Sequence, residues 1–201
     1  MSAAALPPIR QKPGAGLPWP EWAVLRFWIF PRACRKLDWP RAAEMFQREG
    51  EKVLALWDAL TPPERLAERV LIPRLRGIED SSRDWSVAMT VEHLNIVGNA
   101  FLEIIQELRA GRVPPAVAST ASVKPRGATP PAEVRAAFVR MLADAVSVGR
   151  LPAPTQEELR AKYRHPWFGP IDAHAWHCLN GIHQRLHRTQ IESILARLPA
   201  T

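Results

Sequence analysis

The sequence contains little cysteine and no apolar run long enough to cross a membrane. Its two cysteines, Cys34 and Cys178, form neither a CxxC nor a CxxxC pattern, which argues against a disulfide framework and against a thiolate zinc site. The short apolar run WAVLRFWIF is interrupted by Arg26 and ended by Pro31. A membrane span needs roughly 18–20 apolar residues, and the first residues also lack the apolar core of a signal peptide. We therefore expect a protein of the reducing cytoplasm.

Charge of one sign is not concentrated in any segment. Lysine and arginine number 27 against 20 aspartates and glutamates, a net charge of +7, yet there is no long basic run. The densest basic patch, Arg32, Arg35 and Lys36, lies beside Asp38. This scatter argues against a dedicated nucleic-acid module, whereas the net charge is compatible with an anionic membrane surface.

Length and composition favour one globular domain with an extension. A chain of 201 residues, 47% hydrophobic and 23% charged, can bury a core of ordinary size. We expect residues 1–38 to form an N-terminal extension whose first part, rich in Pro, Gly and Ala, is disordered or loosely docked. The rest of the extension mixes aromatic with basic residues: Trp19, Trp22, Phe27, Trp28 and Phe30 with Arg26, Arg32 and Arg35. We favour its packing on the body of the protein over its lying on a membrane surface or covering an apolar groove.

Residues 39–201 show helical periodicity in four segments, about 40–60, 86–110, 130–149 and 172–198. Ser86 and Asp172 are predicted caps, and Gly111 and Gly149 follow or end two of the helices. No segment alternates as a strand does. Four amphipathic helices of about twenty residues most economically form an all-α four-helix bundle.

The second helix has a predicted inner face that includes a histidine. Its members are Met89, His93, Ile96, Val97, Ala100, Ile104 and Leu108. The segment that follows, residues 112–129, is too long and too poor in large side chains for a tight turn between helices. It is predicted to be a flexible lid or disordered.

His183 and His187 lie four residues apart in the last helix, so their rings share one face and can bind one ion. The pair alone is a weak signal, because two histidines on the outside of a basic helix are common. Gln184 stands where the HExxH motif has its glutamate, which excludes a zinc protease. His93 would add a third inward imidazole, although a lone buried histidine more often bonds a neighbouring side chain. Three histidines on two helices match the three protein ligands of a catalytic zinc.

Polar residues near the histidine pair differ in their helical position. Asn180 and Gln190 share the face of the pair and are candidates to orient a ligand. His165 lies ahead of the last helix in RHPWFGPID, where it can overhang the site, although we favour a structural role for that stretch.

Four other residues are not expected to take part. His174 and His177 are predicted to be exposed near the start of the last helix, and Cys178 to be a packed or half-buried thiol. Glu92 neighbours His93 in sequence but points away from it, so it is predicted to be solvated.

Three stretches, DWSVAMTVEHLNIV, HPWFGPIDAHAW and IHQRLHRTQI, resemble the DinB-like superfamily of four-helix-bundle metalloenzymes. The resemblance covers about residues 40–198 and leaves the aromatic extension unexplained. It implies that His93, His183 and His187 bind one divalent ion, with Gln190 following the last two. Three imidazoles suit Zn²⁺, Ni²⁺ or Fe²⁺ equally.

The resemblance also implies a reaction class. Relatives with assigned chemistry are metal-dependent transferases or isomerases that use a low-molecular-weight thiol such as bacillithiol or mycothiol. We therefore expect a small-molecule substrate and a thiol-dependent transferase or a related hydrolase, although no side chain is an evident general base. Homodimers are common among such bundles. The alternative is a non-enzymatic scaffold or binding module whose aromatic, basic N-terminal arm contacts a partner or a membrane surface.

Overall fold

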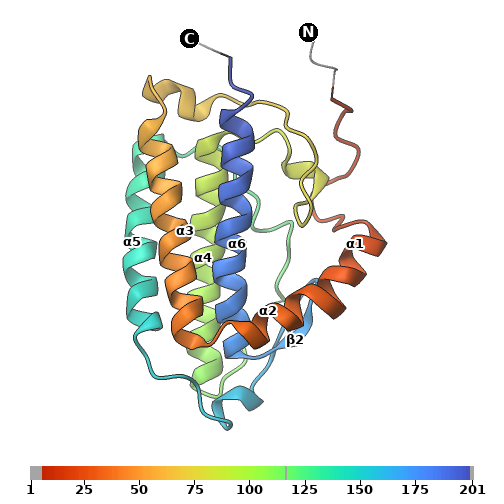
Figure 1. Ribbon diagram of the computed structural model, residues 1–201, viewed down its shortest axis with the longest axis vertical. Helices are drawn as coiled ribbons and strands as arrows, with labels where there is room; N and C mark the ends of the chain where they lie inside the picture. The colour runs from red at the N-terminus through yellow and green to blue at the C-terminus, as the bar shows by residue number, and fades with distance from the viewer. Residues whose placement is uncertain (1–5, 116, 200–201) are drawn as a thin grey trace.

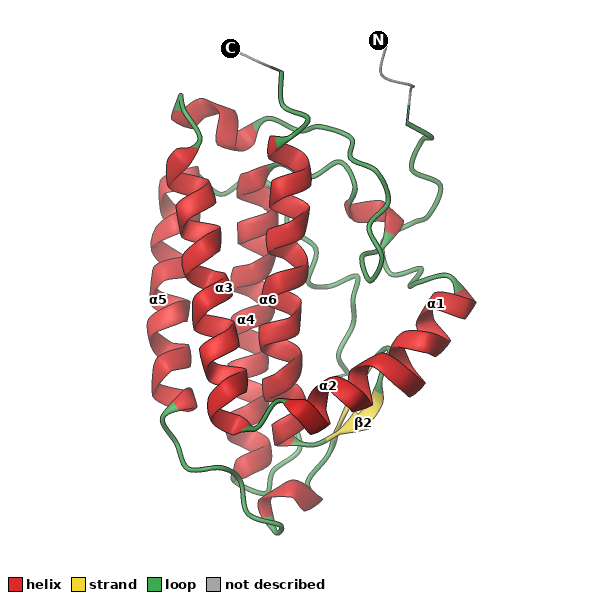
Figure 2. Cartoon of the chain, in the orientation of Figure 1, coloured by secondary structure: helices red, strands yellow, loops and turns green. Residues whose placement is uncertain are grey.

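The chain is all-α apart from one short hairpin. The computed structural model describes residues 6–115 and 117–199. Within them, four long helices lie side by side: α3 (Trp39–Ala59), α4 (Val87–Arg109), α5 (Pro131–Gly149) and α6 (Ala173–Leu195) (Figure 1, Figure 2). Helix α3 packs against α5 and α6, and α4 packs against the same two helices. The four predicted helical segments are therefore helices, and their apolar residues share one core.

Side-chain caps explain where the two histidine-bearing helices begin. Ser86 Oγ accepts a hydrogen bond from the amide of Met89 at 3.1 Å, and Asp172 Oδ1 accepts one from the amide of Ala175 at 2.9 Å. These first-turn amides have no partner within their helix, so a side-chain oxygen at this position stabilises the helix start. Both caps were predicted, and they set the helical positions of the histidines that follow.

The inner face of α4 differs from the predicted stripe. Ile96 is 37% exposed, and Met89, Ala100 and Ile104 are half-buried. The face that enters the core is rotated from it and contains the buried residues Val87, Val91, Leu94, Val97, Leu102, Ile105 and Leu108. The prediction failed for Ile96 because this residue lies on the solvent side of α4 with the exposed Asn99 and Glu103. Met89 lies on another side, where Gly127 of the 112–129 loop packs against it.

A two-stranded hairpin precedes α6. Strands β1 (Tyr163–His165) and β2 (Gly169–Ile171) pair antiparallel, with His165 opposite Gly169. The sequence showed no strand because three residues are too few to reveal alternation. Short 3-10 turns, Pro63–Ala67, Asp80–Ser82 and Glu158–Arg160, lie in the other connections.

The aromatic part of the N-terminal extension is one continuous helix ahead of α3. It consists of α1 (Trp19–Val24), a π-helical stretch (Leu25–Ile29) and α2 (Phe30–Lys36). This helix runs obliquely to the long helices, with α2 near the start of α3 (Figure 1), and α2 contacts α6. Phe30 is buried and stacks on Phe168 with ring centroids 4.2 Å apart. One side of the extension is therefore packed on the body, as we favoured.

Two irregular segments are held against the body by buried carboxylates. The amide of Arg10 donates to Asp80 at 2.8 Å, and the amide of Gly14 donates to Glu79 at 3.1 Å, so the arm is docked over these residues. Residues 1–5, which we also expected to be disordered, lie outside the described residues. The ammonium group of Lys124, in the 112–129 loop, lies 2.7 Å from a Glu79 oxygen. The loop is thus a docked cover on α4.

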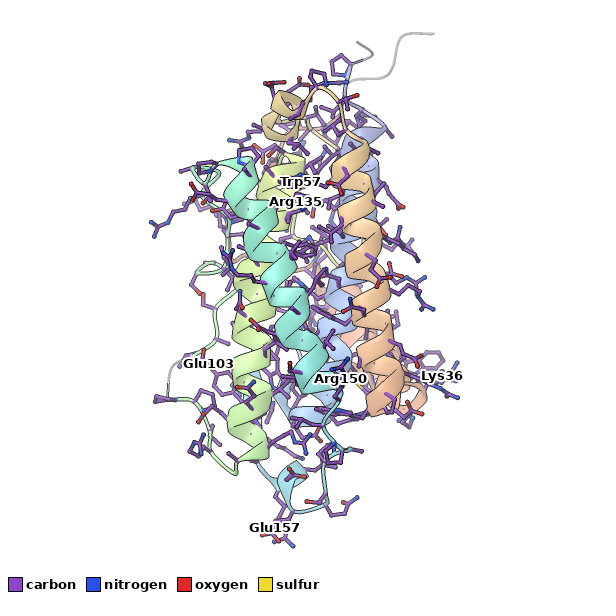
Figure 3. The ribbon with its side chains drawn as sticks, turned by 90° about the vertical axis from the view of Figure 1, so that its left-hand side faces the viewer. Lys36, Trp57, Glu103, Arg135, Arg150 and Glu157 are labelled. Carbon is purple, nitrogen blue, oxygen red and sulfur yellow. The ribbon has the colours of Figure 1, made fainter. Side chains whose placement is uncertain are left out.

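Exposed ion pairs bridge the outer surfaces of the helices. Figure 3 looks onto α5, where Arg135 lies near the end of α3, and its guanidinium is 2.8 Å from Asp58. A pair so exposed contributes at most about 1 kcal/mol to stability. Among the described residues, no helix is both long enough and apolar enough to cross a membrane.

Candidate metal centre

The structure brings His93, His183 and His187 together between α4 and α6. One ring nitrogen from each lies within 4.8 Å of the other two. The Nε2 atoms of His93 and His183 are 3.2 Å apart, and the ring centroids of His183 and His187 are 4.4 Å apart. Two nitrogens bound tetrahedrally to one zinc ion at about 2.1 Å lie roughly 3.4 Å from each other. The observed spacing therefore fits a shared divalent ion.

Hydrogen bonds determine which ring nitrogen of His93 and of His187 faces the cluster. His93 Nδ1 lies 2.7 Å from the carbonyl oxygen of Val123, and because a carbonyl only accepts, Nδ1 carries the proton. His187 Nδ1 lies 2.7 Å from Gln190 Oε1. The Gln190 amide nitrogen donates to the Ser82 carbonyl at 2.8 Å, which fixes the amide orientation. Both histidines therefore turn an unprotonated Nε2 toward the cluster, as metal-binding histidines do.

His183 completes the cluster, and two arrangements fit the position of its Nε2 atom. Its Nε2 faces the Nε2 lone pair of His93 at 3.2 Å, and two lone pairs repel each other at this distance. Either His183 Nε2 carries a proton and donates to His93, or a cation lies between the two nitrogens. The first arrangement is an ordinary hydrogen bond between neutral imidazoles, whereas the second is a metal site.

Apolar surroundings keep the three imidazoles neutral. The ring of Trp85 lies 6.2 Å from that of His187 and nearly parallel to it, and Phe101 lies 5.8 Å from His183. Burial lowers the pKa of His93 to about 4 and holds the pKa values of His183 and His187 well below the ordinary histidine value. Neutral imidazole is the form that binds metal ions, so the cluster is ready for a cation at physiological pH.

The 112–129 loop contributes to the cluster through its backbone and one lysine. Val123 supplies the carbonyl that binds His93, and the adjacent Lys124 donates to Ser82 Oγ at 2.9 Å. The Lys124 ammonium also lies 5.3 Å from the ring centroid of Trp85. Sequence reasoning missed these contacts, because a main-chain carbonyl in an irregular loop has no residue signature.

Glu92 is half-buried, so it is less solvated than predicted. Its carboxylate accepts hydrogen bonds from the amide of Gly127 at 2.9 Å and from Thr129 Oγ1 at 3.3 Å. Glu92 therefore anchors the far end of the loop and does not belong to the histidine group, as predicted.

The three residues predicted to support the pair occupy different places. Gln190 is fully buried and bonds His187 directly. Asn180 is buried but has no hydrogen bond to the histidines among the described residues. His165 accepts from the amide of Trp167 at 3.1 Å through Nδ1, which places its proton on Nε2. Its ring is 6.5 Å from that of Phe101, and its charge would lower the pKa of His183, so His165 lies beside the cluster without belonging to the ligand group.

The prediction that His174 and His177 are exposed is wrong. His177 is buried, stacks on Trp39 with ring centroids 4.0 Å apart and bonds the Trp39 carbonyl through Nε2 at 3.1 Å. His174 is half-buried, and its Nε2 lies 3.2 Å from the carbonyl of Cys34. The first turns of α6 are covered because the N-terminal helix and the start of α3 pack over them, which the periodicity of α6 alone does not reveal.

The two cysteines, distant in sequence, meet in this region. Cys178 is fully buried, and its Sγ lies 3.6 Å from His174 Nε2. A hydrogen bond with Cys34 and burial raise the pKa of the Cys178 thiol, so it stays protonated. This neutral thiol is a packed residue, as predicted, and lies outside the histidine cluster.

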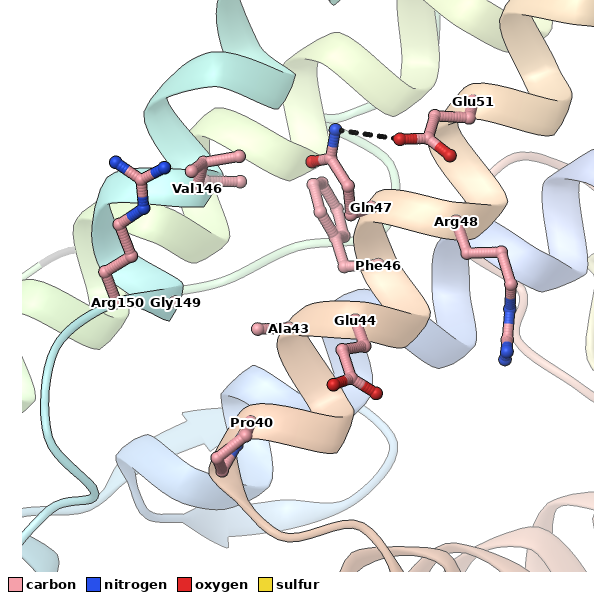
Figure 4. A pocket seen from close by; sticks show the side chains of 11 residues that line it. Pro40, Ala43, Glu44, Phe46, Gln47, Arg48, Glu51, Val146, Gly149 and Arg150 are labelled. Carbon is pink, nitrogen blue, oxygen red and sulfur yellow. Dashed lines mark hydrogen bonds between the residues drawn. The ribbon is translucent and has the colours of Figure 1, made fainter.

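An open groove lies elsewhere, between α3 and α5 (Figure 4). Phe46 and Val146 form part of its floor, and Glu44, Glu51 and Arg150 lie around it. It contains no histidine or cysteine, and its charged side chains point outward to solvent. The groove is therefore separate from the candidate metal centre.

Searches of family models, of curated proteins and of solved structures find no match to the chain. The argument for function therefore depends on the geometry of the histidine cluster.

Burial of His177 should make the stability of the metal-free protein depend on pH. Burial lowers its pKa to about 4, whereas an unfolded histidine titrates near ~6.5. The unfolded chain then binds more protons between these values, so stability is complete above the unfolded pKa and falls as the pH drops toward 4. At about pH 5, burial of this histidine should lower the free energy of unfolding by roughly 2 kcal/mol relative to neutral pH.

Urea unfolding with a chelator present, at neutral pH and at about pH 5, tests this prediction. His177→Gln should lose less stability on acidification than the wild type does. Gln184→Leu, at a buried position of the same helix that does not titrate, should change stability equally at both pH values. Equal acid sensitivity of His177→Gln and the wild type would contradict the prediction.

Proposed function

We propose that this protein is a divalent-metal-binding enzyme of the DinB-like four-helix-bundle kind, with His93, His183 and His187 as its ligands. One observation carries the proposal: three neutral imidazoles from two helices converge, and two of them present Nε2 atoms whose lone pairs are oriented by other hydrogen bonds. Any buried histidine needs a hydrogen-bond partner, so it is the convergence of the three imidazoles, with two Nε2 lone pairs left free, that favours a metal ion. The pairwise packing of α3–α6 supports the bundle assignment.

The donor set fits a borderline divalent ion, because three imidazole nitrogens suit Zn²⁺, Ni²⁺ or Fe²⁺. Such an ion would supply Lewis acidity and would lower the pKa of a water or thiol beside it. No carboxylate belongs to the ligand group among the described residues. The ion would therefore keep its full positive charge, which favours an anionic thiol as the reaction partner.

The protein's own residues position the ligands and exclude water. The Val123 carbonyl and Gln190 Oε1 hold protons at the Nδ1 atoms of His93 and His187, which keeps each Nε2 free. Trp85 and Phe101 form apolar walls, so charges beside the histidines interact more strongly than in bulk water. Among the described residues no carboxylate belongs to the histidine group. We therefore favour a thiol-dependent transferase, whose nucleophile comes from the co-substrate, or a related hydrolase in which the ion would activate water.

Metal content tests the proposal directly. Protein purified without a histidine tag and incubated with Zn²⁺, Ni²⁺ or Fe²⁺ should retain about one equivalent of one of them after desalting, because three ligands converge on one point. His183→Ala/His187→Ala should retain almost none, and His174→Ala, on the same helix but outside the cluster, should retain the wild-type amount. Negligible metal in both the wild type and the double variant, by mass spectrometry of the elements, would sink the proposal.

Gln190 should control metal affinity without touching the metal. Gln190→Leu leaves His187 Nδ1 without its acceptor, so affinity in a chelator competition should fall by roughly 10- to 100-fold. Gln190→Glu restores an acceptor and should keep most of the affinity. Gln184→Leu, which removes another buried glutamine of α6, is the matched control and should bind metal as the wild type does. Unchanged affinity in a folded Gln190→Leu protein would show that the hydrogen bond has no such role.

The thiol co-substrate has a test of its own. N-acetylcysteine should bind the metal-loaded protein roughly tenfold more tightly than N-acetylserine, because a thiol deprotonates beside a divalent ion far more readily than an alcohol. Titration calorimetry measures both, and chelator-treated protein should show no preference. Equal affinities for the two compounds would contradict a thiol-dependent reaction without contradicting the metal site.

A further inference from the structure

The continuous helix formed by residues 19–36 has one side firmly attached to the body. Trp22 Nε1 and Arg26 Nη1 each donate to the carbonyl of Trp167 at 3.0 Å. Glu21 accepts from the amide of Gly77 at 2.6 Å and also pairs with Arg74. These contacts join the helix to the hairpin ahead of α6 and to the turn before α4. The helix is therefore a fixed part of the surface.

The opposite side of this helix is apolar and exposed; we call it the aromatic face. Its members, with their exposed fractions, are Trp19 (74%), Val24 (53%), Phe27 (63%), Trp28 (66%) and Ile29 (51%). All of the exposed large aromatic side chains of the described residues lie here, whereas exposed aliphatics elsewhere, such as Val139 and Leu151, are scattered. Exposed apolar side chains gathered on one helix indicate an interaction surface.

The exposed charges of the helix of residues 19–36 have one sign. Arg32, Arg35 and Lys36 are exposed at its carboxyl end, and the Arg32 guanidinium lies 4.9 Å from the ring centroid of Trp28. Glu21, the only acidic residue between 19 and 36, points inward and is paired. The exposed side of the helix thus combines aromatic rings and cations and has no carboxylate.

A lipid bilayer fits this combination better than a second copy of the chain. Aromatic rings favour the level of the lipid headgroups, and basic side chains beside them are attracted to anionic lipids. A stable dimer interface uses roughly 20–30 residues from each partner, and the aromatic face offers one helix. The attachment of the helix on its other side leaves the aromatic face free to lie flat on a surface.

We propose that the aromatic face docks the protein peripherally on anionic membranes, with the helix of residues 19–36 parallel to the bilayer plane. The apolar side chains enter the headgroup region while Arg32, Arg35 and Lys36 contact lipid phosphates. This inference is independent of the histidine cluster and goes beyond the enzymatic proposal. It places the hairpin that carries His165 close to the membrane, because Trp22 and Arg26 bind that hairpin directly.

Sedimentation with vesicles tests the proposal on the full-length chain. The protein should pellet with vesicles of equal parts phosphatidylcholine and phosphatidylglycerol, and its affinity for pure phosphatidylcholine should be roughly a hundredfold lower, since each of the three basic side chains near an anionic surface contributes roughly a fivefold gain. Phe27→Ser/Trp28→Ser should abolish binding, and Arg32→Gln/Arg35→Gln/Lys36→Gln should abolish the preference for anionic lipid. Val139→Ser/Leu151→Ser removes two exposed apolar residues elsewhere and should bind as the wild type does.

Two results would overturn the proposal. One is a wild-type chain that stays in the supernatant with both kinds of vesicle. The other is a concentration-dependent dimer in light scattering that Phe27→Ser/Trp28→Ser disrupts while neither protein binds vesicles, which would assign the aromatic face to a second copy. Metal content should be unchanged in every variant, so failure here is distinguishable from failure of the metal proposal.

Discussion

The buried ion pair between Lys124 and Glu79 connects three segments near the histidine cluster: the 112–129 loop, the N-terminal arm and the turn that contains Ser82. Burial alone would raise the pKa of Glu79, yet the bond with Lys124 and the arm amides lower it, so the carboxylate is charged. Glu79 also binds the arm through the amide of Gly14, while Lys124 contacts Ser82 and the face of Trp85. A buried charge that lost its partner would cost several kcal/mol, so these segments stay together.

The position of the histidines follows from this connection. Val123, next to Lys124, orients His93, and Ser82 orients His187 through Gln190. Both hydrogen bonds therefore come from segments that the ion pair holds. Ligand geometry on α4 and α6 thus depends on irregular backbone as much as on helix packing, as expected where outer partners orient metal-binding imidazoles.

The helices and the histidine triad were predictable because their signals are local. Ser86 and Asp172 cap helices by the chemistry of their own side chains, and the four-residue spacing of His183 and His187 places both on one face whatever else packs nearby. The all-α class follows from the same periodicity.

The failures have a common physical origin in packing between distant segments. Ile96 was assigned to the core because it is apolar and follows His93 by three residues, yet the packing of α4 leaves it on the solvent side with Asn99 and Glu103. His177 was assigned to solvent because only the fold places Trp39 over it. The contact of the Val123 carbonyl with His93 could not be predicted, because every residue has a main-chain carbonyl. The DinB-like identity, the metal and the reaction remain predictions.

The carbonyl of Val123 has a consequence for how this protein tolerates sequence change. A main-chain acceptor does not depend on the identity of the side chain attached to it, so point substitutions at that position leave the same oxygen available to His93. Insertions and deletions are different, because one residue more or less between Lys124 and Gly127 would pull one of these two anchors off its partner, and the Val123 carbonyl moves with Lys124. At Val123 itself, loop length rather than side-chain identity is therefore the variable that selection or an engineer has to hold constant.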